Sequence, residues 1–462
     1  MHAKQSRREF LRCLGTAGAA LFLGACKPTA PTSAPGPGEP VTGKTSEVPT
    51  TTPKEKIKLT FWGDFTKHVQ GDIINEFNNE TPDIEVEALN VPSNPEKLIT
   101  SVTGGNPPDL FSMDRYLAGE WAARGVIMPV EEFVNTSKII KKERFYERLL
   151  RDVTWRNQMW AVPKGTDCRA FWWNKTIFKE LDLDPEKPPT TWAELETCAD
   201  QITKRNADNK LERLGFSPIA GNPPGFLQFW IYLWQLGGLY LSEDNNKAVF
   251  NSQEGVKALE WMVHMTDKYG GIDEIAEFLK PPSLAEGQDI FSMGFLGMQV
   301  HGHWMAAQYA RYAADLDYGV SGIPIPEGGQ RVNYIGGWTW VIPKGVKHPE
   351  ATFRFIEYNM TDENQLRIAL FGGGIPPYED LAFSDAWLQG DPKREVFANE
   401  VKVGRWVPVT PGVSEMFSIQ IRVLDEALHH LKTPQEALDQ GVKEVQEILD
   451  KNKDLREGKQ IT

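Results

Sequence analysis

The chain lacks several features that would assign it quickly to a class. No apolar run reaches the roughly 20 residues that a membrane-spanning helix needs, and the longest, residues 14–24, lies near the N-terminus. There is no Gly-x-Ser-x-Gly, no His-Glu-x-x-His and no Gly-x4-Gly-Lys pattern. The common signatures of serine hydrolases, zinc proteases and nucleotide-binding loops are therefore absent.

Basic residues are scarcer than acidic ones. The chain has 50 Lys and Arg against 63 Asp and Glu, a net charge of −13. Residues 1–25 carry four basic residues and one acidic residue, so the chain without them has a net charge of −16. Such an acidic surface repels phosphate backbones, and we do not expect nucleic acid as a partner.

The N-terminal segment has the form of an export signal. Residues 6–12 read Ser-Arg-Arg-Glu-Phe-Leu-Arg, as in a twin-arginine signal, and the apolar run is followed by Leu-Gly-Ala-Cys at 23–26. The pattern predicts a lipoprotein signal peptide over residues 1–25 and a lipid on Cys26, with the protein held outside the cytoplasm at a periplasmic or outer membrane face. The alternative is an N-terminal anchor helix in which Cys26 is an ordinary buried thiol.

Only four cysteines are present. Cys13 would leave with the signal peptide and Cys26 would carry lipid, which leaves Cys168 and Cys198. These two could pair in an oxidising compartment. Two free, buried thiols are the favoured interpretation, because twin-arginine export usually carries protein that has already folded.

Residues 26–56 are rich in Pro, Thr and Ser and contain almost nothing large and apolar. Such a segment cannot bury enough surface to offset its ordering entropy, so we predict a disordered tether. The remaining length is sufficient for two domains with cores of their own.

Strand and helix patterns alternate after the tether. Strands are predicted at 56–62, 82–89 and 108–113, and helices at 72–79, 97–102 and 116–124, the last ended by Gly125. This order predicts an α/β fold with a parallel sheet covered by helices, in which ligands bind beyond the carboxyl ends of strands. Trp62, Asp64, Asp114 and Arg115 stand at those ends.

A second α/β unit follows. Strands are predicted at 168–173, 297–302, 318–323 and 337–342. Helices are predicted from a Thr191 to Glu194 capping box through residue 202, and at 251–268, 350–359 and 434–449.

Several sequence fragments are more specific than this general pattern of strands and helices. They are Phe61-Trp62, the turn Gly104-Gly105-Asn106-Pro107-Pro108-Asp109-Leu110, Asp167-Cys168-Arg169 with Trp172-Trp173-Asn174-Lys175, and the segments 297–304, 336–345 and 349–351. In this order the chain resembles extracellular solute-binding protein family 1, the sugar-binding lipoproteins of ABC importers that include maltose-binding protein.

The resemblance implies a two-lobed periplasmic-binding-protein fold with a hinge near residues 163–166. One lobe would comprise residues 57–164 and 322–360, and the other residues 165–321 and 361–462. It further implies a monomer that is not an enzyme, uses no cofactor or metal, closes on a sugar or similar polar solute, and delivers it to ABC permease subunits.

Sugar binding needs polar groups for the hydroxyls and aromatic faces for the ring. The resemblance places Asp167 and Arg169 in the cleft, and their spacing puts them on one face of a strand; the alternative is a local ion pair. It also places Asp64, Asp114 and Arg115 as polar contacts, although such residues also cap turns. The remaining candidates are the stacking residues Trp304, Trp62 and Trp338, the backbone of Gly337, and Gln228, Trp234 and His303.

Alternatives remain open at this point. His301 and His303 could bind a metal, but the spacing provides no third ligand and hydrogen bonding is the favoured interpretation. At least half of the aromatic residues between 221 and 238 are expected in the core. A surface glycoside hydrolase or lyase also fits a Trp-rich cleft with paired carboxylates, and a receptor could instead take a polyol, a glycerol phosphodiester or another polar solute.

Overall fold

The computed structural model describes residues 55–63, 69–89, 91, 95–220, 225–280 and 287–458. The predicted signal peptide, the predicted lipidation site Cys26, all but the last two residues of the predicted tether, and Asp64 lie outside these ranges. Within them, no helix combines the length and the apolar character needed to cross a bilayer.

The first sheet contains the predicted parallel strands. β1 pairs in parallel with both β2 and β3, and β13, from much later in the chain, joins antiparallel between β3 and β6. β3 is buried along nearly its whole length because it has a strand on each side. The sheet order is β2 (Ile84–Leu89), β1 (Ile57–Trp62), β3 (Leu110–Asp114), β13 (Trp338–Val341) and β6 (Val162–Pro163).

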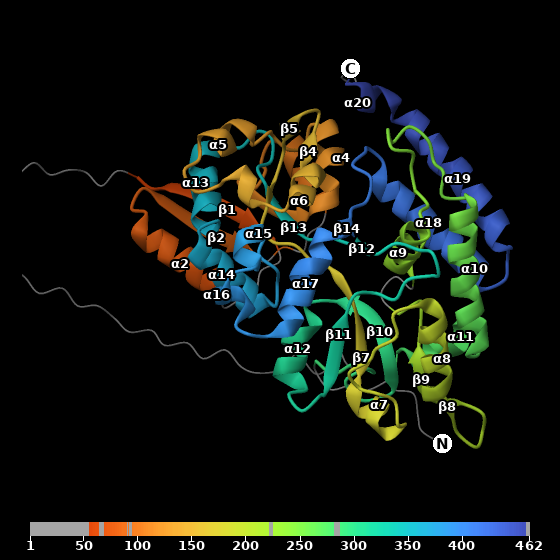
Figure 1. Cartoon of the computed structure of the whole chain (residues 1–462). Helices are drawn as coiled ribbons and strands as arrows, with labels where there is room; N and C mark the ends of the chain where they lie inside the picture. Colours follow the sequence, from red (N-terminus) through yellow and green to blue (C-terminus); the bar gives the residue numbers. More distant parts are fainter. Residues whose placement is uncertain are drawn as a thin grey trace, which may run out of the picture. The chain divides into compact units, whose positions relative to one another are not determined.

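The second sheet is built around a strand of aromatic residues. β7 pairs antiparallel with β10 and β11, and β10 pairs in parallel with β9. These strands confirm the predictions at 168–173, 297–302 and 318–323. The order is β11 (Tyr318–Ser321), β7 (Arg169–Asn174), β10 (Leu296–Gly302), β9 (Leu211–Phe216) and β8 (Lys204–Arg205). Figure 1 shows the two groups of strands as separate sheets.

Two small strand pairs complete the strands. The hairpin β4–β5 follows α6, and β12 pairs in parallel with β14. Their bounds are β4 (Thr154–Trp155), β5 (Gln158–Met159), β12 (Asn333–Tyr334) and β14 (Gly404–Arg405).

The helices up to residue 180 include the three predicted before Gly125. The predicted helix at 116–124 begins as a 3-10 turn and ends at Ala123, with Gly125 at a φ of +68°. The helices are α2 (Val69–Glu80), α3 (Pro95–Thr103), η1 (Arg115–Leu117), α4 (Ala118–Ala123), α5 (Glu131–Thr136), η2 (Lys142–Arg144), α6 (Glu147–Asp152) and α7 (Lys175–Glu180).

The later helices include the predicted capping box. The side chains of Thr191 and Glu194 each accept a hydrogen bond from the other residue's backbone N–H. The helices are α8 (Trp192–Ile202), α9 (Phe226–Gln235), α10 (Gln253–Lys268), α11 (Gly271–Phe278), α12 (Met305–Tyr312), α13 (Pro349–Asn359), α14 (Asp362–Gly372), α15 (Glu379–Ala382), α16 (Asp385–Leu388), α17 (Pro392–Lys402), α18 (Val413–Leu428), α19 (Pro434–Lys451) and α20 (Lys453–Glu457).

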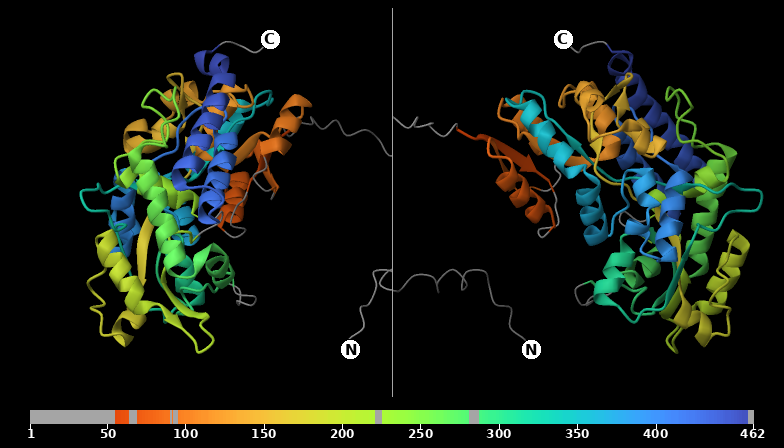
Figure 2. Two further views of the ribbon diagram at one scale, coloured as in Figure 1. Left: turned by 90° about the vertical axis from the view of Figure 1, so that its right-hand side faces the viewer. Right: turned by 60° about the vertical axis from the view of Figure 1, so that its left-hand side comes forward.

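Each sheet has an apolar core of its own. One core surrounds the first sheet and includes Phe61, Phe111 and Phe355. The other surrounds the second sheet and includes most of α9 as well as residues of α10, α18 and α19, which lie side by side in Figure 2. Two cores with separate sheets give the two-lobed α/β architecture that the resemblance implies.

Three segments lie together where the chain passes between the sheets. The backbone N–H of Thr166 donates to the carbonyl of Ile375 at 3.1 Å, and that of Asp167 donates to the carbonyl of Gly336 at 3.3 Å. Segments near residues 166, 336 and 375 are therefore joined by backbone hydrogen bonds at this crossing.

Both cysteines of the described residues are free, as favoured above. Cys168 is fully buried, whereas Cys198 on α8 is only partly buried.

Candidate functional site

A cavity of about 600 Å³ is lined by residues at the ends of both sheets. The first sheet contributes Asp114, at the carboxyl end of β3 where ligand contacts were expected, and Gly337 just before β13. The second sheet contributes the loop and strand residues Asp167 and Arg169. The other lining residues are Tyr116, Ala220, Phe226, Leu227, Gln228, Val300, His301, Gly302, Trp304, Tyr334, Phe417 and Ile421.

The pair Asp167 and Arg169 is both an ion pair and part of the cavity wall. Nη1 of Arg169 donates to Oδ1 of Asp167 at 3.1 Å, and the same oxygen accepts the backbone N–H of Gly336 at 2.8 Å. The Arg169 guanidinium also lies 4.7 Å from the ring centre of Trp304 and 5.2 Å from that of Tyr334. Both polar groups are therefore held in fixed positions at the cavity.

Trp304 lies two residues beyond β10, at the N-terminal cap of α12. Its ring packs against the backbone of Gly302, where a Cβ atom would come within 2.1 Å of the ring carbons. His301 contacts the same ring edge-on, with the ring centres 5.7 Å apart. Only glycine at position 302 leaves room for the indole in this place.

An aromatic wall closes another side of the cavity. The ring centres of Tyr116 and Phe417 are 4.8 Å apart, and those of Phe417 and Phe226 are 4.9 Å apart. Burial and the nearby Asp114 carboxylate raise the pKa of Tyr116, so its hydroxyl keeps its proton and can donate a hydrogen bond. Sequence reasoning missed Tyr116, Tyr334 and Phe417, because no local motif marks them.

Gly337 needs its lack of a side chain. It has a φ of +128°, and a Cβ atom there would lie within about 3 Å of Nη1 of Arg115 and of the carbonyl oxygen of Gly165. Gln228 also lines the cavity, where its amide donates to the carbonyl of Ala220.

Three predicted tryptophans lie elsewhere. Trp234 is buried in the second core against Trp230, 3% exposed. Trp62 has the ammonium of Lys97 4.9 Å from its ring centre, and Trp338 has that of Lys164 at 5.7 Å. Trp338 pairs in register with Asp114, yet neither Trp62 nor Trp338 lines this cavity.

Arg115 is buried directly behind the cavity, with its side chain 1% exposed. Its Nε donates to Oδ2 of Asp152 at 2.7 Å and its Nη1 donates to the carbonyl of Gly165 at 3.2 Å. Burial raises the pKa of Asp152 to about 6, against the opposing effect of the Arg115 charge. Arg115 thus connects α6 to the crossing between the sheets and does not line the cavity.

The two histidines line two different cavities. His301 lines the cavity, whereas His303 is 4% exposed and lines a different hollow beside α12. Burial lowers the pKa of both rings to about 4, so both are neutral at pH 7. The part of the chain that the structure describes contains no group of three or more potential metal ligands.

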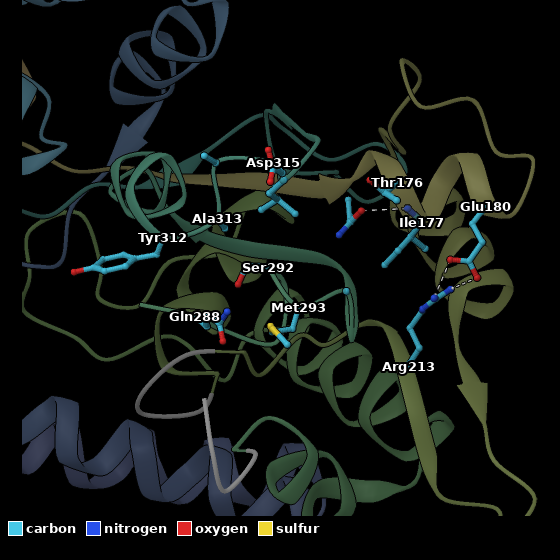
Figure 3. Close-up of a pocket in the computed structure, with 14 residues that line it drawn as sticks. Thr176, Ile177, Glu180, Arg213, Gln288, Ser292, Met293, Tyr312, Ala313 and Asp315 are labelled. Carbon is cyan, nitrogen blue, oxygen red and sulfur yellow. Dashed lines mark hydrogen bonds and ion pairs between the residues drawn. The ribbon is translucent and has the colours of Figure 1, made fainter. Parts of the chain in front are cut away.

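Another hollow, of about 530 Å³, differs from the 600 Å³ cavity in that the second sheet alone supplies its surroundings (Figure 3). Glu180 and Arg213 form a two-fold hydrogen-bonded ion pair at its edge, with distances of 3.1 and 2.9 Å. All of its lining residues come from segments around the second sheet. A relative movement of the two sheets would leave it unchanged, which favours the 600 Å³ cavity as the ligand site.

The chain is similar to known solute-binding proteins. Residues 72–396 match the family model for bacterial extracellular solute-binding protein. The maltotriose-binding protein of Pyrococcus abyssi is 22% identical over 82% of this chain and 78% of its own length. The sn-glycerol-3-phosphate-binding periplasmic protein of Salmonella paratyphi A is 25% identical over 85% of this chain and 92% of its own.

A solved structure is similar over the whole of its own length. CpMnBP1 with mannotriose bound superposes with a TM-score of 0.75, at 25% identity, covering 84% of this chain and 100% of that one. Since the family model also spans well over half of the chain, this protein belongs to the bacterial extracellular solute-binding protein family.

Proposed function

We propose that this protein is the substrate-binding component of an ABC importer and that it captures a mono- or oligosaccharide in the 600 Å³ cavity. The observation that carries the proposal is the composition of that cavity. It combines the carboxylates of Asp114 and Asp167 and the guanidinium of Arg169 with Trp304 and the aromatic wall. Such a set matches the hydroxyl edge and the apolar face of a sugar.

The relatives support a sugar as the solute. One is named for maltotriose and the structural neighbour holds mannotriose. The cavity volume lies within the 300–1,000 Å³ typical of small-molecule sites. Asp64, Trp62 and Trp338 remain candidates for contacts that form when the site closes on its solute.

The same proposal includes closure of two lobes, one of residues 57–164 and 322–360 and the other of residues 165–321 and 361–462. The crossing near residues 166, 336 and 375 supports a hinge there. A solute that touches both sheet ends binds the closed state better than the open state, and therefore shifts the population toward closure. The closed monomer would then present its solute to the permease subunits.

We also infer export and anchoring from the N-terminal pattern. Lipid on Cys26 would hold the binding unit at the membrane while the tether lets it reach the permease. Cys26→Ser should move the protein from the membrane to the soluble fraction or leave uncleaved precursor. Incorporation of a fatty-acid analogue into the Ser variant would contradict this assignment.

A second candidate solute is a glycerol phosphate or phosphodiester. It is favoured by the relative named for sn-glycerol-3-phosphate and by Arg169, whose guanidinium suits phosphate oxygens. The sugar and phosphate proposals differ in how strongly solute binding depends on Arg169, because binding of a phosphate would depend most strongly on that residue.

The decisive experiment is a thermal-shift screen followed by calorimetry with maltotriose, mannotriose and sn-glycerol 3-phosphate. A sugar receptor should bind one of the saccharides and return it unchanged after hours of incubation. Shortened products would instead support the hydrolase or lyase alternative. Binding of sn-glycerol 3-phosphate alone would replace the sugar by the second candidate.

A further inference from the structure

A second cavity, of about 500 Å³, lies beside the 600 Å³ cavity, which we call the sugar cavity after its proposed solute. The two share no lining residue, although the adjacent residues Trp304 and His303 belong to one each. We call the second one the α12 cavity. Its other lining residues come from α12, from Tyr318 of β11, from the C-terminal end of α14, and from α16 and α17: Ala306, Ala307, Ala310, Arg311, Tyr318, Ala369, Leu370, Phe371, Gly373, Gly374, Trp387, Asp391, Arg394 and Phe397.

His303 lines this cavity and carries a buried hydrogen-bond donor. Its Nδ1 accepts the backbone N–H of Cys168 at 3.4 Å, so the hydrogen of the neutral ring is on Nε2. Nε2 is buried and has no hydrogen-bond partner among the described residues. The backbone of Gly373 lies near enough to influence the ring's pKa, but it does not reach hydrogen-bonding geometry. A small shift toward Gly373, a water molecule or a bound acceptor would each satisfy this donor.

The charge around the cavity is positive. Arg394 donates to Oε1 of Gln389 at 3.0 Å and to the carbonyl of Trp387, and neither oxygen neutralises it. The Arg311 guanidinium lies 5.5 Å from the ring centre of Phe371. In the described ranges neither arginine has a carboxylate within ion-pair distance.

One carboxylate does line the cavity, and its bonds are local. Oδ1 of Asp391 accepts the backbone N–H of Lys393 at 3.0 Å, which caps α17, and it lies 3.7 Å from Nζ of Lys393. Asp391 is thus balanced by Lys393, and the two arginines remain in excess.

The remaining walls are apolar. Trp387 and Phe397 are each 2% exposed, and Ala306, Ala307 and Ala310 of α12 add aliphatic surface to the lining. Three donors beside aromatic and aliphatic walls suit a molecule with anionic oxygens at one end and an apolar body.

We propose that the α12 cavity is a second binding site, distinct from the sugar cavity, for a small organic anion. Its carboxylate or phosphate oxygens accept from Nε2 of His303 and from the guanidinium groups of Arg311 and Arg394. Its apolar body packs against Trp387 and Phe397. Because His303 contacts Trp304 edge-on, with ring centres 5.6 Å apart, an occupant here lies one side chain away from the sugar cavity.

The test is calorimetry on the full chain with three probes of similar shape. Benzoate and phenyl phosphate carry the anionic oxygens, and benzyl alcohol is the neutral analogue. We expect at least one of the two anions to bind at least tenfold more tightly than benzyl alcohol; the tighter of the two identifies the oxygens that the site prefers.

Two variants locate the binding. Arg311→Gln changes an exposed side chain, so it should fold normally and weaken anion binding at least fivefold. His303→Leu removes the donor and should weaken it at least tenfold, and its folding is checked by circular dichroism. Arg151→Gln, an exposed arginine on α6 that lines neither cavity, is the matched control and should bind like the parent.

The outcome that overturns the proposal is clear in each arm. Equal binding of all three probes, or no binding of either anion, would mean that the cavity holds water only. Anion binding that Arg311→Gln leaves unchanged would place the anion elsewhere on the protein.

Discussion

The wall of the sugar cavity and the layer directly behind it each contain an ion pair of one Arg and one Asp, and the two pairs differ in their exposure to solvent. At the wall, Arg169 and Asp167 pair at 3.1 Å with side chains 12% and 19% exposed. Behind it, Arg115 and Asp152 pair at 2.7 Å with side chains 1% and 4% exposed. The first pair can exchange bonds with a solute, whereas the second is sealed.

The buried pair leaves two of its own polar atoms without partners in the described part of the chain. Nη2 of Arg115 and Oδ1 of Asp152 have no hydrogen-bond partner within the described residues. A buried pair of this kind holds elements in register, here α6 and the crossing near Gly165, while adding little net stability. The comparison teaches that burial separates an Arg–Asp pair that a solute can reach from an Arg–Asp pair that only joins parts of the fold.

The largest effect should follow from breaking the buried pair. Arg115→Met leaves the Asp152 carboxylate buried without its partner and should lower the free energy of unfolding by about 3–5 kcal/mol. Urea denaturation measures this. Arg169→Met at the wall should cost about 1 kcal/mol or less, because water can replace the lost partner.

The double variant Arg115→Met with Asp152→Leu provides the control. Removing both charges should restore most of the lost stability, since well-packed apolar replacements of buried pairs are often neutral or better. If the double variant were as unstable as the single one, the loss would come from packing and the comparison of the two pairs would fail.

The wall residues should dominate affinity instead. Asp167→Ala leaves a solute hydroxyl without its acceptor and should weaken binding by roughly 1–3 kcal/mol with little change in folding stability. Trp304→Ala removes a stacking face and should cost about as much. Calorimetry with the solute found in the screen measures both, and parent-like affinity in both folded variants would move the site elsewhere.

The histidines extend the comparison to pH. Burial lowers the pKa of His301 and His303 to about 4, below the ordinary value near 6.5 that the unfolded chain would show. The native state therefore takes up protons less readily, and their stabilising contribution is present above about pH 6.5 and is lost as pH falls toward 4.

Denaturation between pH 7 and 4 should show this loss, and His301→Gln should reduce its slope by about one proton. A slope that is the same in parent and variant would indicate that His301 titrates normally at the cavity wall.

The smallest effect concerns shape. If the two sheet ends close on the solute, small-angle scattering should show a slightly smaller radius of gyration at saturation, and the intrinsic tryptophan fluorescence should change. An unchanged radius together with steady product formation would favour a hydrolase over a receptor.

Much of the fold could be predicted from the sequence, because its signals are local. The two-residue period of β1, the capping box at Thr191, and Gly125 after α4 each depend on neighbours a few residues away. The position of Asp167 and Arg169 on one face was predictable for the same reason, since residues two apart on an extended chain point the same way.

The selection of site residues was decided by tertiary structure. Trp304 and Trp234 are both tryptophans of aromatic segments, yet one lines the cavity and the other is buried among Trp230 and its neighbours. Tyr116, Phe226 and Phe417 form one wall although they come from three distant segments. Exposure and contact depend on which elements pack together, and a single sequence contains no local signal for that packing.

What the sequence by itself determined was the alternation of strands and helices, the acidic net charge, and the family pattern. Only the tertiary structure decided that Arg115 pairs with Asp152 in the interior, that His303 turns to the α12 cavity, and that His301 lines the sugar cavity. The physical reason is that secondary structure follows from short-range periodicity, whereas burial and pairing follow from contacts between residues far apart along the chain.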